Sequence, residues 1–219
     1  MKKKNKKNYL NLINLYFSEK KYVYDLINKS KIYELFQSVK KTYINDSNIY
    51  ILANGGSSAI GEGFAIDLRT HPFVSEDKNK SRDIRRIKVF CLTESSGMLT
   101  GISNDLGFEN VFSEQLKNYL RSKKINRNDN LICLSSSGNS ENVLNAIRFA
   151  KKFGVITSCI AGRGGGKACK LVDIPIIIKG SSKFPGQIGK NDNNFHIEDV
   201  QNSISHIITG LLKDYVSKK

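Results

Sequence analysis

Residues 130–153 read NLICLSSSGNSENVLNAIRFAKKF, and this stretch decides the fold class. Its first five residues form an apolar run with the length and composition of a buried β-strand. A loop of serine, glycine and asparagine follows at 135–140, and residues 141–153 then carry apolar side chains at helical spacing. A strand that is apolar on both faces, followed by a short loop and an amphipathic helix, is typical of a parallel sheet covered by helices. The stretch therefore predicts an α/β fold.

The same unit repeats along the chain on both sides of this stretch. Residues 48–53 form a second apolar strand, which ends on Asn54-Gly55-Gly56-Ser57-Ser58 and leads into a helix that runs to about Arg69. Further strands are expected at 87–92, 155–160 and 174–178, and further helices near 97–104, at 111–120 and at 196–216. The polar residues 71–86 between them are expected to form an exposed loop. We therefore expect a three-layer α/β/α sandwich around a five-stranded parallel sheet.

The residues before the first strand form a helical extension. Apolar positions recur at helical spacing over residues 8–42, and the polar residues 28–30 interrupt them, so two helices are expected. Amphipathic helices of this kind pack on their own core or on a partner subunit. We therefore divide the chain into N-terminal helices at 1–45 and a domain at 46–219.

The composition of the 219 residues narrows the class of protein. No run approaches the ~20 apolar residues of a membrane span, and the lysine-rich start lacks the unbroken apolar segment of a signal peptide. We therefore expect a cytoplasmic protein without membrane contact. The net charge of +15 would suit nucleic acid, but the lysines are scattered and form no stripe with aromatic residues. Attraction of anionic substrates is the simpler consequence of this charge, and nucleic-acid binding is not expected.

The four cysteines, Cys91, Cys133, Cys159 and Cys169, form no C-x-x-C pair. Three of them fall within the apolar runs that predict strands. A zinc cluster or a disulfide framework would need closer or paired spacing, so buried, reduced thiols are expected.

The two loops 54–58 and 135–140 share a composition that suits a phosphate group. Helix N-termini offer unpaired N–H groups and the positive end of the helix dipole. Glycine lets the backbone approach a ligand closely, and serine hydroxyls donate to phosphate oxygens. A single serine at a helix start is commonly an N-cap, but three consecutive serines and Ser140 exceed what capping needs. Neither loop matches the dinucleotide or P-loop patterns, so nucleotide binding is disfavoured.

Five segments, spread over residues 50–210, resemble the sugar isomerase (SIS) fold and within it the phosphoheptose isomerases. They are 54–57 (NGGS), 103–113 (SNDLGFENVFS), 135–143 (SSSGNSENV), 161–167 (AGRGGGK) and 197–206 (IEDV…H). The resemblance implies a SIS domain at 46–219 and an aldose–ketose isomerisation of sedoheptulose 7-phosphate or a close relative. It also implies a role in heptose synthesis for lipopolysaccharide or capsule, and a homotetramer whose sites are shared between subunits.

The resemblance also implies roles for single residues. The family's phosphate-binding serines fall on Ser57, Ser135, Ser137 and Ser140, with Ser136 beside them and Asn54, Gly55 and Gly56 in the first loop. Its catalytic histidine falls on His206 and its catalytic carboxylate on Asp67, where many members have glutamate. Glu198 stands where they have glutamine, and we include it among the expected catalytic residues. Glu94 falls where the family often has an acidic residue near the sugar.

Zinc is the cofactor that the resemblance makes possible. Many members carry a histidine four residues before the catalytic carboxylate, where it helps to bind zinc, and this chain has Gly63 there. The metal site would thus lack one ligand, or be rebuilt from Asp67, Glu198 and His206, since carboxylates and a histidine can hold a divalent metal.

Other readings of the polar residues stay open. His206 could be a core histidine on an amphipathic helix, and Asp67 could be solvated. His71 lies in the charged loop, where a solvated side chain is expected, and His196 could be a surface or phosphate-facing residue. Asn54, Asn104 and Asp105 could bind sugar hydroxyls, although such residues also form turns.

Two other functions compete with the isomerase: a non-catalytic SIS scaffold that binds a protein partner, and a sugar-phosphate-binding regulator. Retention of His206 favours the enzyme, because its mechanism needs an acid and a base near neutral pH. Glu198 and His206 are eight residues apart, about 12 Å along one helix, and their directions differ by about 80°. We therefore expect a homo-oligomer in which His206 and Asp67 of different chains meet in one site.

Overall fold

The computed structural model describes residues 2–120, 128–187 and 193–218. Its centre is one sheet of five strands, all parallel, in the order β2-β1-β3-β4-β5. The strands are β1 (Asn48–Ala53), β2 (Lys88–Cys91), β3 (Asn130–Ser135), β4 (Ile156–Ala161) and β5 (Ile174–Ile177). The predicted five-stranded parallel sheet is confirmed, and each strand lies within about two residues of its expected position.

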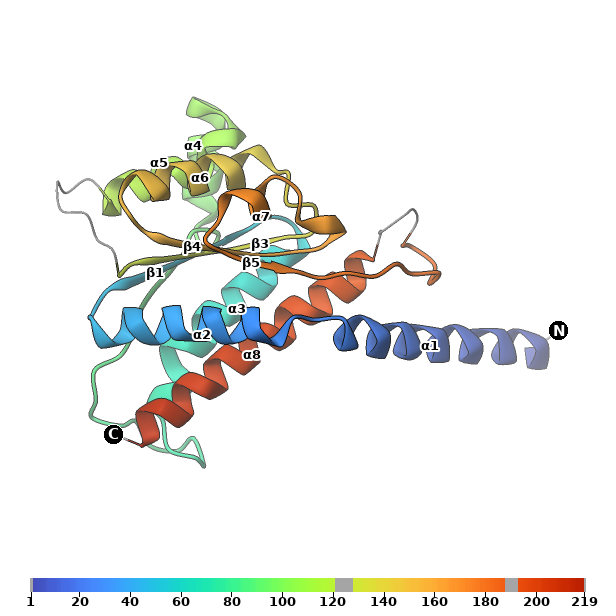
Figure 1. The fold of residues 1–219 in the computed structure, drawn as a ribbon. Helices are drawn as coiled ribbons and strands as arrows, with labels where there is room; N and C mark the ends of the chain where they lie inside the picture. Colours follow the sequence, from blue (N-terminus) through green and yellow to red (C-terminus); the bar gives the residue numbers. More distant parts are fainter. Residues whose placement is uncertain (1, 121–127, 188–192, 219) are drawn as a thin grey trace.

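Helices cover both faces of this sheet (Figure 1). One face carries α2 (Lys29–Ile44), α3 (Gly56–Thr70) and α8 (Asn194–Ser217). The other carries α5 (Val111–Tyr119), α6 (Glu141–Lys152) and the short α7 (Ala168–Leu171), with α4 (Ser96–Leu106) beyond α5. Each layer buries its own apolar cluster against the strands, which is the predicted three-layer sandwich.

The order of the strands creates a switch point between β1 and β3. The chain leaves β1 outward to β2 and returns to β3 on the other side of β1. Ala53 and Leu134 are partners in the register, so β1 and β3 end side by side. Ligands of open parallel sheets bind where strand order reverses, beyond the carboxyl ends of the strands. The loops that follow β1 and β3 occupy this position.

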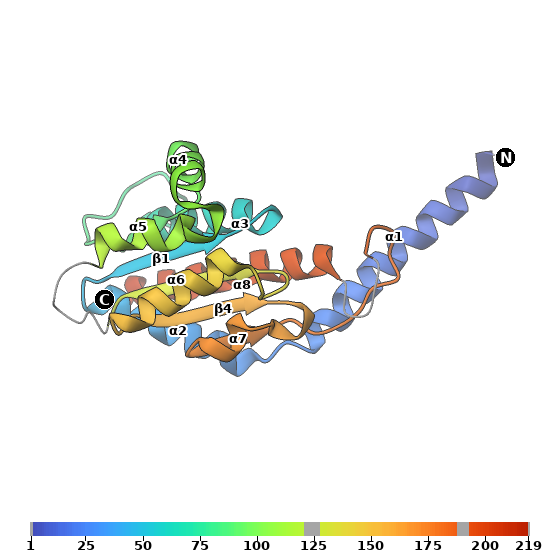
Figure 2. The ribbon, with the colours of Figure 1, turned by 90° about the horizontal axis from the view of Figure 1, so that it is seen from above.

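The N-terminal helix α1 (Lys2–Asp25) extends beyond the body of the molecule (Figures 1 and 2). Its second half packs on the start of α8, and Val23 is fully buried in the core cluster of that face. α2 packs against the sheet through Leu35 and Val39, which are also fully buried. The N-terminal helices thus contact the core, and the division of the chain at residue 45 stays a prediction.

Several local features differ from, or add to, the expectations. The segment expected as an exposed loop starts with a 3₁₀ helix at His71–Phe73, whose Phe73 is fully buried. α7 was not expected, because it has only four residues. All four cysteines are free and buried, as expected.

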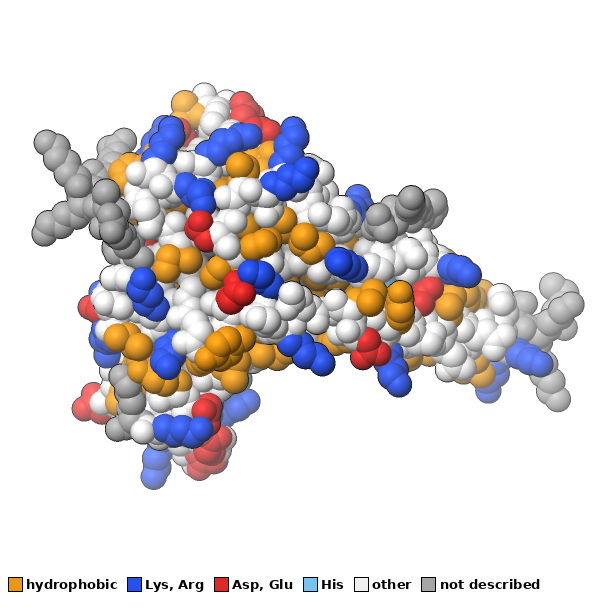
Figure 3. Space-filling view, in the orientation of Figure 1, with side chains coloured by type: hydrophobic (Ala, Val, Ile, Leu, Met, Phe, Trp, Pro, Cys, Tyr) orange, Lys and Arg blue, Asp and Glu red, His pale blue; other side chains and the backbone are white. Residues whose placement is uncertain are grey.

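The distribution of charged side chains and the hydropathy of the helices can be compared with the expectations from composition. On the face shown in Figure 3, lysine and arginine side chains are dispersed over several elements and interspersed with acidic ones. In the part of the chain that the structure describes, no helix combines the length and apolarity that a bilayer crossing requires.

Candidate functional site

The two serine and glycine loops meet in one cavity of about 310 Å³, which we call the serine pocket. The loops after β1, β3 and β4 and the start of α8 contribute its walls. The lining residues are Asn54, Gly55, Gly56, Ser135, Ser136, Ser137, Ser140, Arg163, Asn194 and Glu198. Eight of the residues predicted from the sequence are therefore brought together here, seven of them from the two loops and Glu198 from α8.

Helix N-termini supply donors to the serine pocket. α3 begins after Gly55 and α6 after Ser140, and neither start has a side-chain cap. Their first N–H groups, which have no intrahelical partner, are therefore available to an anion. Gly55 has φ +58°, a left-handed conformation that favours glycine and turns the backbone toward the cavity.

Hydrogen bonds connect the first loop to the start of α6 and order the second loop internally. The side-chain amides of Asn54 and Asn142 donate to each other's oxygens at 2.9 and 3.0 Å. The Ser135 hydroxyl accepts from the Gly138 N–H at 3.0 Å, and the Ser137 hydroxyl accepts from the Asn139 N–H at 3.2 Å. Both hydroxyl protons remain available to a ligand, since each oxygen acts only as an acceptor in these bonds.

One cation and one carboxylate flank the serine pocket. The Arg163 guanidinium donates to the Asn194 side chain at 2.9 Å, and Arg163 adopts a left-handed φ of +48° that is uncommon for a non-glycine residue. Glu198 lies against Gly56, where an added Cβ would come within 2.4 Å of its carboxylate. Burial and, second, the nearby charge of Asp199 raise the pKa of Glu198. A phosphate dianion beside Glu198 would favour its protonated form further.

Ser57 is placed behind the pocket and does not line it. Its hydroxyl donates to the Gln201 side chain at 2.8 Å, and Gln201 in turn donates to the Ile160 carbonyl at 3.0 Å. Ser57 is 2% exposed. Its side chain therefore ties α3 to α8 in this structure, while its backbone N–H lies in the first turn of α3.

His206 and Asp67 lie in a separate cavity of about 340 Å³, the histidine cavity. It is lined by Asp67, His71, His206, Thr209, Gly210 and Lys213. The Asp67 carboxylate is 3.7 Å from His206 Nε2 and 3.5 Å from His71 Nε2. One chain therefore brings His206 and Asp67 together, because α3 and α8 pack side by side; contrary to the expectation, no second chain is needed for this pair to meet.

The three histidines occupy different environments. The His206 side chain is 60% exposed, so the alternative of a core histidine is wrong. His71 is not merely solvated, since it faces Asp67. His196 is fully buried, with its Nε2 3.3 Å from the Glu19 carboxylate, so it is neither a surface residue nor phosphate-facing.

The remaining predicted residues lie outside both cavities. Glu94 forms an ion pair with Arg69 at 2.6 Å. Asn104 and Asp105 lie near the exposed end of α4, where the Asn104 amide donates to the Asp105 carboxylate at 2.9 Å. A single chain brings none of these three residues to the serine pocket.

Sequence reasoning missed Arg163, Asn194 and His71. Arg163 belongs to the glycine-rich segment 161–167, in which no single residue was predicted to bind a ligand. The Asp67–His71 spacing of four residues places both side chains on one helix face, and this signal was available in the sequence. Arg163 and Asn194 are 31 residues apart, so no local sequence pattern indicates their contact.

Removing the Ser137 hydroxyl should weaken anion binding. We expect Ser137→Ala to lose about 1–3 kcal/mol of affinity for inorganic phosphate, the cost of a missing hydrogen bond to a charged group. Isothermal calorimetry measures this, with Ser96→Ala, at the exposed start of α4, as the matched control. Equal affinities of Ser137→Ala and the unchanged protein would remove Ser137 from the site.

The fold and this cavity define a class: α/β proteins that are built to hold an anion at the carboxyl edge of a parallel sheet. Comparison with known proteins makes the class specific. A family model described as SIS domain matches residues 16–162. The phosphoheptose isomerase of Sulfurimonas denitrificans is 31% identical over 201 residues, which cover 90% of this chain and 89% of that protein. The phosphoheptose isomerase of Campylobacter concisus is 38% identical over 146 residues, 67% of this chain and 70% of that protein.

Solved structures agree on the fold. A phosphoheptose isomerase from Francisella tularensis superposes with a TM-score of 0.74 at 20% identity, covering 94% of this chain and 98% of the other. The chain belongs to the SIS domain family and, within it, to the family of the phosphoheptose isomerases.

Proposed function

We propose that this protein interconverts sedoheptulose 7-phosphate and D-glycero-D-manno-heptose 7-phosphate. The observation that carries the proposal is the convergence of both serine and glycine loops on one pocket at the switch point of the sheet, beside Glu198. Relatives at 31–38% identity that bear the name phosphoheptose isomerase support this reaction. The phosphate of the sugar would lie in the serine pocket, on the N-termini of α3 and α6.

The chemistry needs only a base and an acid. Starting from the ketose, a base removes a proton from C1, and an enediol forms while the C2 oxygen gains a proton. Return of a proton to C2 and loss of the proton on the C1 oxygen then give the aldose, so atoms and electrons balance without a co-reactant. We propose that His206, oriented by Asp67, removes the proton from C1 and returns a proton to C2. Glu198, whose raised pKa suits an acid, transfers the protons at the two oxygens.

A comparison of ketose phosphates tests this proposal. The purified protein is incubated with ketose phosphates of seven, six and five carbons, and aldose formation is followed. We expect the highest kcat/KM for the seven-carbon substrate. If the protein converts none of the three ketose phosphates, the proposed function is wrong.

We further propose that the active protein is a homotetramer whose sites combine residues of two chains. The serine pocket and the histidine cavity share no lining residue, and Glu198 and His206 are about 12 Å apart along α8. A second copy related by two-fold symmetry would present its histidine cavity to the serine pocket of the first.

Subunit exchange tests the shared site. The Ser135→Ala/Ser137→Ala double variant and the His206→Ala variant are each expected to be nearly inactive. Mixed under subunit exchange, they should regain activity at about a quarter of the sites, where the intact serine pocket of one chain meets His206 of the other. No recovery, with proven exchange of subunits, would place the complete site within one chain, and a monomer in light scattering would exclude the tetramer.

For zinc, we propose weak binding or none. An added Cβ at Gly63 would meet no atom within 4 Å, so the space of the family's histidine ligand is open. Within residues 2–120, 128–187 and 193–218, no group of three His, Cys, Asp or Glu side chains is placed to hold a metal ion, and Glu198 lies apart from Asp67 and His206. The residues present do not fit the metal.

Metal analysis checks this proposal. Protein purified without added metal is expected to contain far less than one zinc per chain, and a chelator should leave its kcat unchanged. Tightly bound zinc at one ion per chain, or loss of activity with the chelator, would overturn it.

We place the protein in the cytoplasm, in heptose synthesis for lipopolysaccharide or capsule. This location suits a charged sugar phosphate, which does not cross membranes unaided, and four free cysteines suit a reducing compartment.

A further inference from the structure

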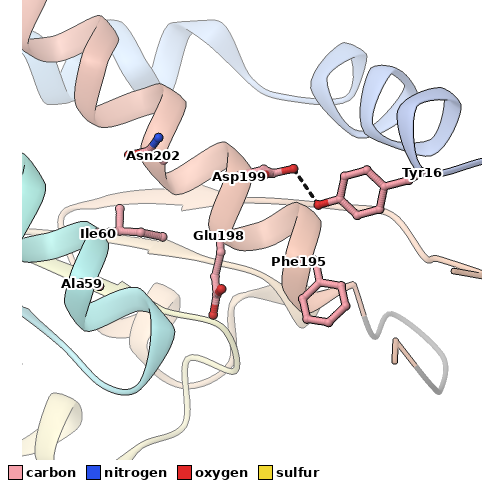
Figure 4. Close-up of a pocket in the computed structure, with 7 residues that line it drawn as sticks. All are labelled: Tyr16, Ala59, Ile60, Phe195, Glu198, Asp199 and Asn202. Atoms are coloured by element: carbon pink, nitrogen blue, oxygen red, sulfur yellow. Dashed lines mark hydrogen bonds between the residues drawn. The ribbon is translucent and has the colours of Figure 1, made fainter. Parts of the chain in front are cut away.

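A third cavity lies where α1 meets α3 and α8 (Figure 4). Its volume is about 530 Å³, within the usual range of ligand sites. The lining residues are Tyr16, Ala59, Ile60, Phe195, Glu198, Asp199 and Asn202. We call it the α1 cavity, because Tyr16 of the N-terminal helix closes one side of it.

The α1 cavity adjoins the serine pocket across a single side chain. Glu198 lines both cavities, and Figure 4 shows its side chain pointing from α8 toward the start of α3. A ligand whose phosphate lies in the serine pocket can therefore extend past Glu198 into the α1 cavity. Asn202 lies one turn further along α8, in the direction of His206.

The walls of the α1 cavity combine aromatic rings with hydrogen-bonding groups. Tyr16 and Phe195 offer ring surfaces to the C–H groups of a carbon chain. Asp199 and Asn202 offer acceptors and a donor to hydroxyl groups. This mixture suits a polyhydroxylated chain better than a purely apolar ligand or a second anion.

Tyr16 and Asp199 are fixed in place before any ligand binds. The Tyr16 hydroxyl donates to the Asp199 carboxylate at 2.8 Å (Figure 4), and Lys20 forms an ion pair with the same carboxylate at 3.0 Å. Burial, and then the hydrogen bond to Asp199, raise the pKa of Tyr16, so its hydroxyl stays protonated. The centroid of the Tyr16 ring lies 4.4 Å from that of the fully buried His196 ring.

The same part of α1 is anchored to the loop before α8. Glu19 accepts from the Ser182 hydroxyl at 2.5 Å and from the Lys183 N–H at 2.7 Å. It also contacts His196 Nε2 at 3.3 Å. These contacts hold the middle of α1 on the domain, so the wall that Tyr16 supplies is a fixed part of the cavity.

We propose that the α1 cavity receives the hydroxylated carbon chain of the sugar phosphate, and that Tyr16, Asp199 and Asn202 determine which chain length binds. The N-terminal helix is then part of the substrate site and does more than extend the fold. This inference rests on the proposed function, because it takes the serine pocket as the phosphate site.

Calorimetry with ligands of different length tests the proposal. Inorganic phosphate, a five-carbon ketose phosphate and a seven-carbon ketose phosphate are titrated into the full-length protein and into Tyr16→Phe and Asn202→Ala. Tyr16→Phe keeps the ring against His196 and removes only the hydroxyl, so the fold is preserved. Tyr9→Phe, at an exposed position of the same helix, is the matched control.

Asn202→Ala removes one hydrogen-bonding side chain, and Tyr16→Phe removes the hydrogen bond that positions the Asp199 carboxylate in the cavity. We expect each of these changes to weaken binding of the seven-carbon ligand by about 5–10-fold. Affinity for inorganic phosphate should change less than twofold, and Tyr9→Phe should change neither. Equal losses for all three ligands, or no loss for any, would overturn the proposal. If the unchanged protein binds the sugar phosphates without converting them, the proposed function fails while the chain-length dependence still decides this inference.

Discussion

Replacement of His206 by alanine is expected to lower kcat for the ketose phosphate by about 10²–10⁴-fold, the usual contribution of a general base. His206 is accessible and lies 3.7 Å from the Asp67 carboxylate, which can orient the imidazole. KM should change by less than about threefold, because the phosphate is held elsewhere, in the serine pocket.

Thr209→Val is the matched control for this substitution. Thr209 lines the same cavity as His206, and valine has almost the same shape but no group that can move a proton at neutral pH. We expect kcat of Thr209→Val within about threefold of the unchanged protein. If His206→Ala keeps more than about a tenth of the activity, or if Thr209→Val loses as much, His206 is not the base.

Gly138→Ala is expected to destabilise the protein by about 2–4 kcal/mol and to abolish phosphate binding. Gly138 has φ +64°, and a Cβ there would come within 2.1 Å of the Gly165 carbonyl oxygen. The Gly138 carbonyl also accepts from the Ala168 N–H at 2.8 Å. The clash is with the backbone of Gly165 and Gly166, so the serine loop must move away from the turn at 163–165.

Urea denaturation measures the loss of stability, and calorimetry measures the loss of binding. Gly101→Ala is the control, since Gly101 lies within α4, has open space around a Cβ and has an ordinary helical φ. Alanine there should be neutral or stabilise by up to about 1 kcal/mol. A Gly138→Ala protein as stable as Gly101→Ala, with normal phosphate affinity, would contradict the described geometry of the loop.

The architecture was predictable because parallel strands are buried on both faces. Continuous apolar runs such as 48–53 and 130–134 are therefore visible in the sequence without knowledge of their partners. The loops at 54–58 and 135–140 were found from composition, since serine and glycine at strand ends have a local physical meaning. The short α7 was missed because four residues carry too little periodicity.

The positions of single side chains were less predictable, because they depend on packing between distant segments. Composition gave Ser57 the same role as Ser137, but Gln201, 144 residues away, holds the Ser57 hydroxyl behind the pocket. The burial of His196 depends on Glu19 of a helix near the other end of the chain. The meeting of His206 and Asp67 within one chain follows from the packing of α3 on α8, which a helical pattern alone does not specify.

In the proposed reaction, this chain moves a proton between C1 and C2 of a ketose phosphate. Proton NMR of sedoheptulose 7-phosphate, incubated with the protein in D₂O, observes this step directly. We predict that aldose signals appear with the unchanged protein and appear at least 100-fold more slowly with His206→Ala. Unaltered spectra after prolonged incubation with stoichiometric protein would rule out the proposed isomerisation, and equal rates for the two proteins would rule out His206 as its base.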